Sequence, residues 1–125
     1  LSALGYSVAP AGDVNGDGFD DIILGAFAAS SNSGAAFLIF GRADGFTDLT
    51  TDALGGAGIR LDGLSRFAGT GYSVASAGDI NGDGFDDVIV GSLIGVFPGS
   101  PASGAAFVVF GKPDGFADVN LTTLG

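Results

Sequence analysis

An acidic stretch punctuated by glycine occurs twice in this chain. Residues 13–21 read DVNGDGFDD, and residues 79–87 read DINGDGFDD. Oxygen-bearing side chains at positions one, three and five, followed by glycine, open a calcium loop, because Ca²⁺ takes about 6–8 oxygen ligands. We expect the two glycines, Gly18 and Gly84, to adopt positive φ at the sharp turn. The predicted ligands are the side chains of Asp13, Asn15, Asp17 and Asp21 with the carbonyl of Phe19, and the side chains of Asp79, Asn81, Asp83 and Asp87 with the carbonyl of Phe85.

The residues after each loop argue against an EF-hand, which has an acidic residue at position twelve and then a helix. Here position twelve is Leu24 or Val90, and the adjoining runs DIILG and DVIVG are typical of strands. A dockerin module, which also needs a helix and that acidic residue, is disfavoured for the same reason. We therefore predict a calcium loop between two strands. Strand alternation points Asp20 and Asp86 away from the metal, as surface or outer residues.

Composition limits the fold and the partners. The chain has 125 residues, 46% of them hydrophobic, which suffices for one modest domain with a core. Its 24 glycines indicate many tight turns and short strands, and nearly exclude long helices. A net charge of −10 makes nucleic acid a poor partner. No apolar run reaches the roughly 18–20 residues of a membrane helix, so no membrane insertion is expected. Eight acidic residues lie in the loops, where two Ca²⁺ ions would reduce the charge from −10 to −6.

An internal repeat divides the chain into 1–66 and 67–125. The segment GYSVA occurs at residues 5–9 and 71–75, and GAAF occurs at 34–37 and 104–107. The difference in spacing places four extra residues in a loop at 93–103, where insertions are tolerated. The predicted strands are residues 6–11, 21–26, 35–40 and 58–62 in the first unit, and residues 72–77, 87–92 and 105–110 in the second.

The second and third strands of each unit are apolar on both faces, which predicts sheets covered on both sides. Since few residues are available for helices, neighbouring sheets must provide that cover. We therefore predict an all-β fold of two four-stranded antiparallel β-propeller blades, with the second blade lacking its outer strand. A blade with an open edge, and two blades that cannot close a ring, indicate further blades of the same chain or identical copies. Three arrangements stay open: a fragment of a longer propeller, a ring of copies, and a head-to-tail filament with a strand supplied in trans.

The combination of GYSVA, GDxNGDGFDD and a terminal Phe-Gly resembles the FG-GAP repeat. The resemblance covers both units, and the loop is its specific part. It implies the propeller of integrin α subunits, with Ca²⁺ bound between the first two strands of a blade. Carried over residue by residue, it implies the two ligand sets given above. It also implies an extracellular or cell-surface location, a structural or adhesive role, and protein or glycan ligands. Phe27 and Ala28 in the first unit, and Leu93 in the second, depart from the proline that often follows Gly-Ala in that family.

An enzyme is not expected. The chain has no His and no Cys, and it contains no nucleophile motif such as G-x-S-x-G. The main alternative to an adhesive segment is a self-assembling structural subunit whose partner is itself. A third alternative is a non-catalytic domain attached to an enzyme in a longer chain. The absence of an initiator Met and of a signal peptide indicates a mature or excised segment.

Overall fold

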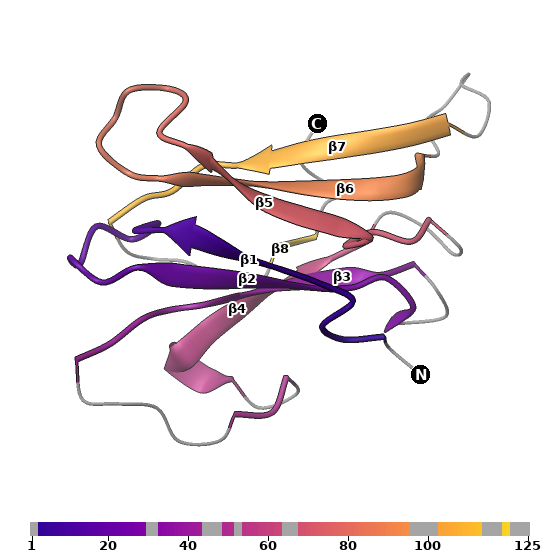
Figure 1. The fold of residues 1–125 in the computed structure, drawn as a ribbon, viewed down its shortest axis with the longest axis horizontal. Coiled ribbons are helices and arrows are strands. Elements are labelled where there is room, and N and C mark those ends of the chain that lie inside the picture. The colour runs from indigo at the N-terminus through magenta and orange to yellow at the C-terminus, as the bar shows by residue number, and fades with distance from the viewer. Residues whose placement is uncertain are drawn as a thin grey trace.

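The computed structural model describes residues 3–29, 33–43, 49–51, 54–63, 68–95, 103–113 and 119–120, and it places them in two stacked sheets (Figure 1). The first sheet has the order β1-β2-β3-β4-β8, and the second has the order β5-β6-β7. The strands are β1 (Ser7–Gly12), β2 (Asp21–Ala26), β3 (Ala35–Ile39), β4 (Gly58–Asp62), β5 (Ser73–Gly78), β6 (Asp87–Gly95), β7 (Ser103–Val109) and β8 (Val119–Asn120), with a 3₁₀ turn η1 (Gly55–Ala57) before β4.

The predicted all-β fold is confirmed. Strands β1 to β4 pair antiparallel in sequence order, as do β5 to β7, and the bounds of β2 and β4 are those expected from the sequence. Among the described residues, the second sheet has three strands and so lacks the outer strand, as predicted. No helix in this part of the chain is long and apolar enough to span a bilayer.

The hairpin of β6 and β7 is longer than predicted. The sequence placed residues 93–103 in a loop, but β6 continues to Gly95, which pairs with Ser103. The register shifts between Ser92 and Gly95, so the extended hairpin contains an irregularity that absorbs extra residues. Pairing continues because each added ladder bond satisfies backbone groups. Residues 96–102 of the predicted loop lie outside the described residues.

Strand β8 was not predicted. It pairs in parallel with β4, through Leu61 with Val119 and Asp62 with Asn120. A short segment of the second repeat therefore covers part of the outer edge of the first sheet. These two residues have no strong strand signal of their own, and they pair because the edge of β4 offers unpaired backbone groups. The local sequence pattern does not reveal such a long-range pairing.

The main core lies between the two sheets. Ile23, Leu38 and Leu61 of the first sheet are fully buried, and they belong to one cluster with Val88 and Val90 of the second sheet. The other face of the first sheet carries a second cluster of five buried residues, which are Ala26, Ala29, Ala35, Phe37 and Ile39. Burial on both faces explains why β3 lacks polar alternation, whereas in β2 the apolar Ile22 is 47% exposed on the face opposite the main core.

Equivalent residues of the two repeats differ in burial. Val74 is 9% exposed, whereas its counterpart Val8 is 62% exposed. Conversely, Val14 is fully buried, whereas its counterpart Ile80 is 55% exposed. The sheets therefore stack head to tail, with the back face of the first repeat (the side of Ile23 and Val14) on the front face of the second (the side of Val74 and Val88). The front face of the first repeat and the back face of the second are left without a sheet partner in the described part of the chain.

Candidate metal loops

Each acidic loop connects the first two strands of its repeat, β1 with β2 and β5 with β6. Both loops turn through glycines with positive φ. Gly16 and Gly18 have φ values of 74° and 91°, and Gly82 and Gly84 have values of 73° and 92°. The expectation for Gly18 and Gly84 is confirmed, and the near-identical angles show that the two loops share one backbone conformation. Glycine adopts this conformation without the steric cost of a Cβ atom.

The first aspartate of each loop organises the turn. The Asp13 carboxylate accepts hydrogen bonds from the N–H groups of Gly16, Asp17 and Gly18, at 2.8, 3.1 and 2.9 Å. Asp79 accepts from the corresponding groups of Asp83 at 3.1 Å and Gly84 at 2.7 Å. Hydrogen bonds to its carboxylate lower the pKa of Asp79, and the N–H of Gly84 is the largest cause.

The middle positions of the loops remain near solvent. Asp17 Oδ1 accepts the N–H of Phe19 at 2.9 Å, and Asp83 Oδ1 accepts that of Phe85 at 3.0 Å. Asn15 Oδ1 accepts the N–H of Asp17 at 3.3 Å. In the second loop Asn81 is exposed. Each of these oxygens is an acceptor with further lone pairs, so these bonds leave capacity for another ligand.

The last aspartate of each loop is buried. Asp21 Oδ2 accepts the N–H of Val14 and its Oδ1 accepts the N–H of Gly41, both at 2.8 Å. Asp87 is bonded in the same way to Ile80 at 2.9 Å and Gly111 at 2.8 Å.

Burial raises the pKa of Asp21. The N–H groups of Gly41 and Val14 oppose this change, while repulsion from Asp17 and Asp13 adds to it. The carboxyl groups of Asp13 and Asp17 thus repel that of Asp21, which is the electrostatic situation that a bound cation relieves.

Sequence reasoning missed the role of the glycine after the third strand. Besides donating to the buried aspartate, Gly41 lies so close to the loop that a Cβ atom would overlap the carbonyl oxygen of Asp20. Gly111 has the same relation to the carbonyl of Asp86. The recurrence of Phe-Gly after both third strands was the available signal. This glycine supports the end of the loop from the neighbouring hairpin.

The contact between the two loops was also missed. Asp86 Oδ2 accepts the N–H of Asp13 at 2.9 Å, and the N–H of Asp86 bonds the Asp13 carbonyl at 3.2 Å. The N–H of Lys112 adds a bond to the carbonyl of Val14 at 3.0 Å. Asp20 is exposed, as predicted, whereas Asp86 is half-buried and joins the second repeat to the first loop.

The donor set fits a hard cation, although the carboxylates are not gathered around one point. Within the described residues, which include both loops completely, no group of three or more Asp, Glu, His or Cys side chains could hold a metal ion. Every predicted side-chain ligand is nevertheless an oxygen donor on a tightly curled loop. Two of the five predicted ligands per loop, an Asn amide and a backbone carbonyl, are not Asp, Glu, His or Cys side chains and so do not count toward such a group. The ten residues predicted from the sequence as Ca²⁺ ligands therefore stay a prediction, with donor atoms of the kind that Ca²⁺ takes.

The family model and the relatives that match this chain point to the same family. The family model described as FG-GAP repeat matches residues 4–39 and 70–109. Integrin alpha pat-2 of Caenorhabditis elegans is 36% identical over 110 residues, which are 87% of this chain and 8% of that protein. Integrin alpha-5 of Xenopus laevis is 35% identical over 117 residues, which are 91% of this chain and 10% of that protein. The chain therefore spans a tenth or less of the length of these relatives.

Proposed function

This chain belongs to the FG-GAP repeat family, and on that premise we propose that it is a calcium-binding segment of an extracellular, adhesion-related β-propeller. The observation that carries the proposal is the duplicated loop with its buried terminal aspartate. Asp21 and Asp87 are 1% and 0% exposed, and each is held by one N–H from its own loop and one from the third strand's end. Burying carboxyl groups next to other acids is unfavourable unless a cation compensates the charge.

The loops would use a bound Ca²⁺ ion to neutralise Asp13, Asp17 and Asp21, and their counterparts, once the chain has folded. A ligand that binds the folded state alone stabilises it by about RT ln(1 + [Ca²⁺]/Kd). With Kd in the range of roughly 10⁻⁴–10⁻³ M for extracellular modules, the loops would fill outside a cell and stay mostly empty inside it. The loops join the two repeats through Asp13 and Asp86, so this binding would also strengthen the contact between the sheets.

The partners follow from the family. Relatives named integrin alpha support a cell-surface, non-enzymatic role in adhesion. The uncovered faces of the two sheets would pack on further blades of the same chain or on identical copies, and the finished surface would present protein or glycan contacts.

Isothermal titration calorimetry tests the proposal. We expect two Ca²⁺ ions per chain, and one in Asp17→Asn, because this change removes a charge from an exposed predicted ligand of the first loop alone. Asp20→Asn is the matched control, since it removes the same charge from the same loop at a position that points away from the ligands, and it should leave two. Absence of calcium binding at about millimolar concentration, the range of extracellular modules, would refute the proposal.

The second candidate function is the self-assembling subunit. Val8 and Ile22 on the front face of the first repeat, and Ile80 on the back face of the second, are about half exposed or more. Their counterparts form the buried interface between the repeats, so the chain presents both halves of an interface that it already forms once.

A further inference from the structure

The second acidic loop contacts the first one with two consecutive residues. Asp86 Oδ2 accepts the N–H of Asp13 at 2.9 Å, and the N–H of Asp86 donates to the Asp13 carbonyl at 3.2 Å. The ring of Phe85 lies against Gly16, so closely that a Cβ atom on this glycine would overlap it. Phe85 and Asp86 therefore hold the first loop at two points, its first residue and its turn.

The residues after β7 add contacts to the same loop. The N–H of Lys112 donates to the Val14 carbonyl at 3.0 Å, and a Cβ atom on Gly111 would overlap the same oxygen. The N–H of Gly111 also donates to the buried carboxylate of Asp87 at 2.8 Å. One glycine thus supports the closing aspartate of the second loop and lies against the backbone of the first.

The contact residues of the second loop are held by its own predicted ligands. The carbonyl of Phe85 is itself a predicted ligand, and Asp86 is followed directly by the predicted ligand Asp87. The N–H of Phe85 donates at 3.0 Å to Oδ1 of Asp83, which is also a predicted ligand. Ordering of the second loop by a cation would therefore order the two residues that contact the first loop.

The first loop meets these residues with its own ligand framework. Both hydrogen bonds of Asp86 are made to the backbone of Asp13, a predicted ligand. The Asp13 carboxylate in turn accepts the N–H of Gly16, the glycine against which Phe85 lies, at 2.8 Å. Ordering of the first loop would therefore order the surface that Phe85 and Asp86 contact.

We propose that the two loops bind Ca²⁺ with positive coupling through Phe85 and Asp86, so that an ion in either loop raises the affinity of the other. The first ion to bind meets the conformational cost of ordering the shared contact, and the second ion binds to a contact that is already ordered. Linkage makes the coupling factor the same in both directions. The inference rests on the proposed calcium binding and goes beyond it, since two independent sites would satisfy that proposal equally well.

Asp86 is a positioning residue in this proposal and not a ligand, because its carboxylate bonds the backbone of Asp13. Direct repulsion between the two ions opposes the coupling. That repulsion is screened by salt, with a Debye length of about 8 Å at physiological ionic strength, whereas partly buried contacts are screened much less. Positive coupling should therefore be clearest at physiological ionic strength.

The test has to follow each loop separately. NMR titration of the ¹⁵N-labelled chain with Ca²⁺ does so, because the N–H of Gly18 donates to Asp13 at 2.9 Å and that of Gly84 to Asp79 at 2.7 Å. Each of these two resonances reports the filling of its own loop. Asp83→Asn alters an exposed predicted ligand of the second loop and no residue of the first. We expect it to weaken binding at the first loop by about fivefold or more.

Three further variants test the route. Asp17→Asn, the matched change in the first loop, should weaken the second loop by the same factor. Asp86→Ala should weaken the first loop, and adding Asp83→Asn to it should then have no further effect there. Asp86→Asn keeps an acceptor oxygen for the Asp13 N–H and should retain most of the coupling, which an effect of charge alone would not allow.

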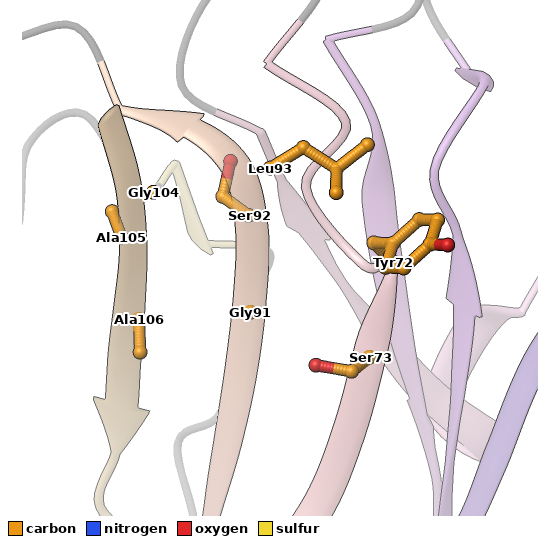
Figure 2. A pocket seen from close by; sticks show the side chains of 8 residues that line it. All are labelled: Tyr72, Ser73, Gly91, Ser92, Leu93, Gly104, Ala105 and Ala106. Atoms are coloured by element: carbon orange, nitrogen blue, oxygen red, sulfur yellow. The ribbon is translucent and has the colours of Figure 1, made fainter. Parts of the chain in front are cut away.

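Two controls separate this route from a general loss of charge or stability. Asp20→Ala removes a charge next to a predicted ligand of the first loop, at the exposed counterpart of Asp86. Ser73→Ala lies at the other end of β5 and β6, in a pocket of about 310 Å³ that is lined by uncharged residues (Figure 2). Both variants should keep the coupling of the unaltered chain.

The outcomes distinguish this inference from the calcium proposal. Two bound ions whose affinities are unchanged or raised by Asp83→Asn and Asp17→Asn would overturn the coupling and leave the calcium proposal standing. A chain that binds no Ca²⁺ at about millimolar concentration would overturn both. An Asp20→Ala variant that weakens the first loop as much as Asp86→Ala would reduce the effect to charge and overturn the route. Should Asp86→Ala fail to fold, Asp83→Asn and Asp17→Asn carry the test, because both positions are exposed.

Discussion

The carboxylate of Asp86, in the second acidic loop, accepts a hydrogen bond of 2.9 Å from the backbone N–H of Asp13, in the first. A Cβ atom on Gly12 would overlap this carboxylate, so the glycine before the loop permits the approach. Residues 73 positions apart in the sequence thus link the two loops directly. The two acidic loops are consequently parts of one structural unit that spans both sheets.

This link predicts that one substitution has different effects in the two repeats. Asp86→Ala should lower the free energy of unfolding by about 1–2 kcal/mol, because it removes a charged acceptor from the Asp13 N–H. Asp20→Ala, the same change at the exposed counterpart, should alter it by less than about 0.5 kcal/mol. Urea denaturation at a concentration where the chain is monomeric measures both values. Equal losses for the two variants would contradict the assignment of Asp86.

The glycine after the third strand should tolerate no side chain. Gly41→Ala would force a methyl group into the carbonyl oxygen of Asp20, and we expect a loss of about 1–3 kcal/mol. Gly56→Ala is the control, since an added Cβ atom meets nothing within 4 Å there, and it should be neutral or slightly stabilising. The two midpoints of urea denaturation give the comparison. A neutral Gly41→Ala would show that the loop end can move away from the third strand.

The head-to-tail stacking predicts a second matched pair. Val14→Ala should destabilise the monomeric chain by about 1–3 kcal/mol, because Val14 is fully buried between the repeats and leaves a cavity. Ile80→Ala deletes more atoms at the counterpart, which is 55% exposed, and should cost less than about 0.5 kcal/mol. Thermal unfolding at low protein concentration shows which of the two variants is less stable. A larger loss of stability for Ile80→Ala than for Val14→Ala would contradict the assignment of Val14 to the interface between the repeats.

Removing calcium should lower stability in both repeats. At about 2 mM Ca²⁺ and a Kd of roughly 10⁻⁴–10⁻³ M, each filled site would contribute about 0.6–1.8 kcal/mol. Excess chelator should abolish this contribution and lower the melting temperature, and Asp17→Asn should reduce the effect of the chelator by about half. A melting temperature that is the same with calcium and with chelator would argue against metal-linked folding.

The sequence was sufficient for the local features. The DVNGDGFDD and DINGDGFDD motifs predicted positive φ at Gly18 and Gly84 because only glycine meets that turn without strain, and the structure confirms it. The apolar runs after the loops predicted strands β2 and β6, and apolar residues on both faces predicted stacked sheets. The chemical identity of each predicted metal ligand also follows from the sequence, because an oxygen donor is a property of the residue itself.

Only the tertiary structure decided which of two equivalent residues is buried. Val8 and Val74, or Asp20 and Asp86, stand in nearly the same local sequence, yet only one of each pair meets the other sheet. The pairing of β8 with β4 and the support of Asp21 by Gly41 are likewise long-range. A repeat encodes its own turns and strands through local periodicity, but burial depends on what is stacked against it, and that is a property of the assembled sheets.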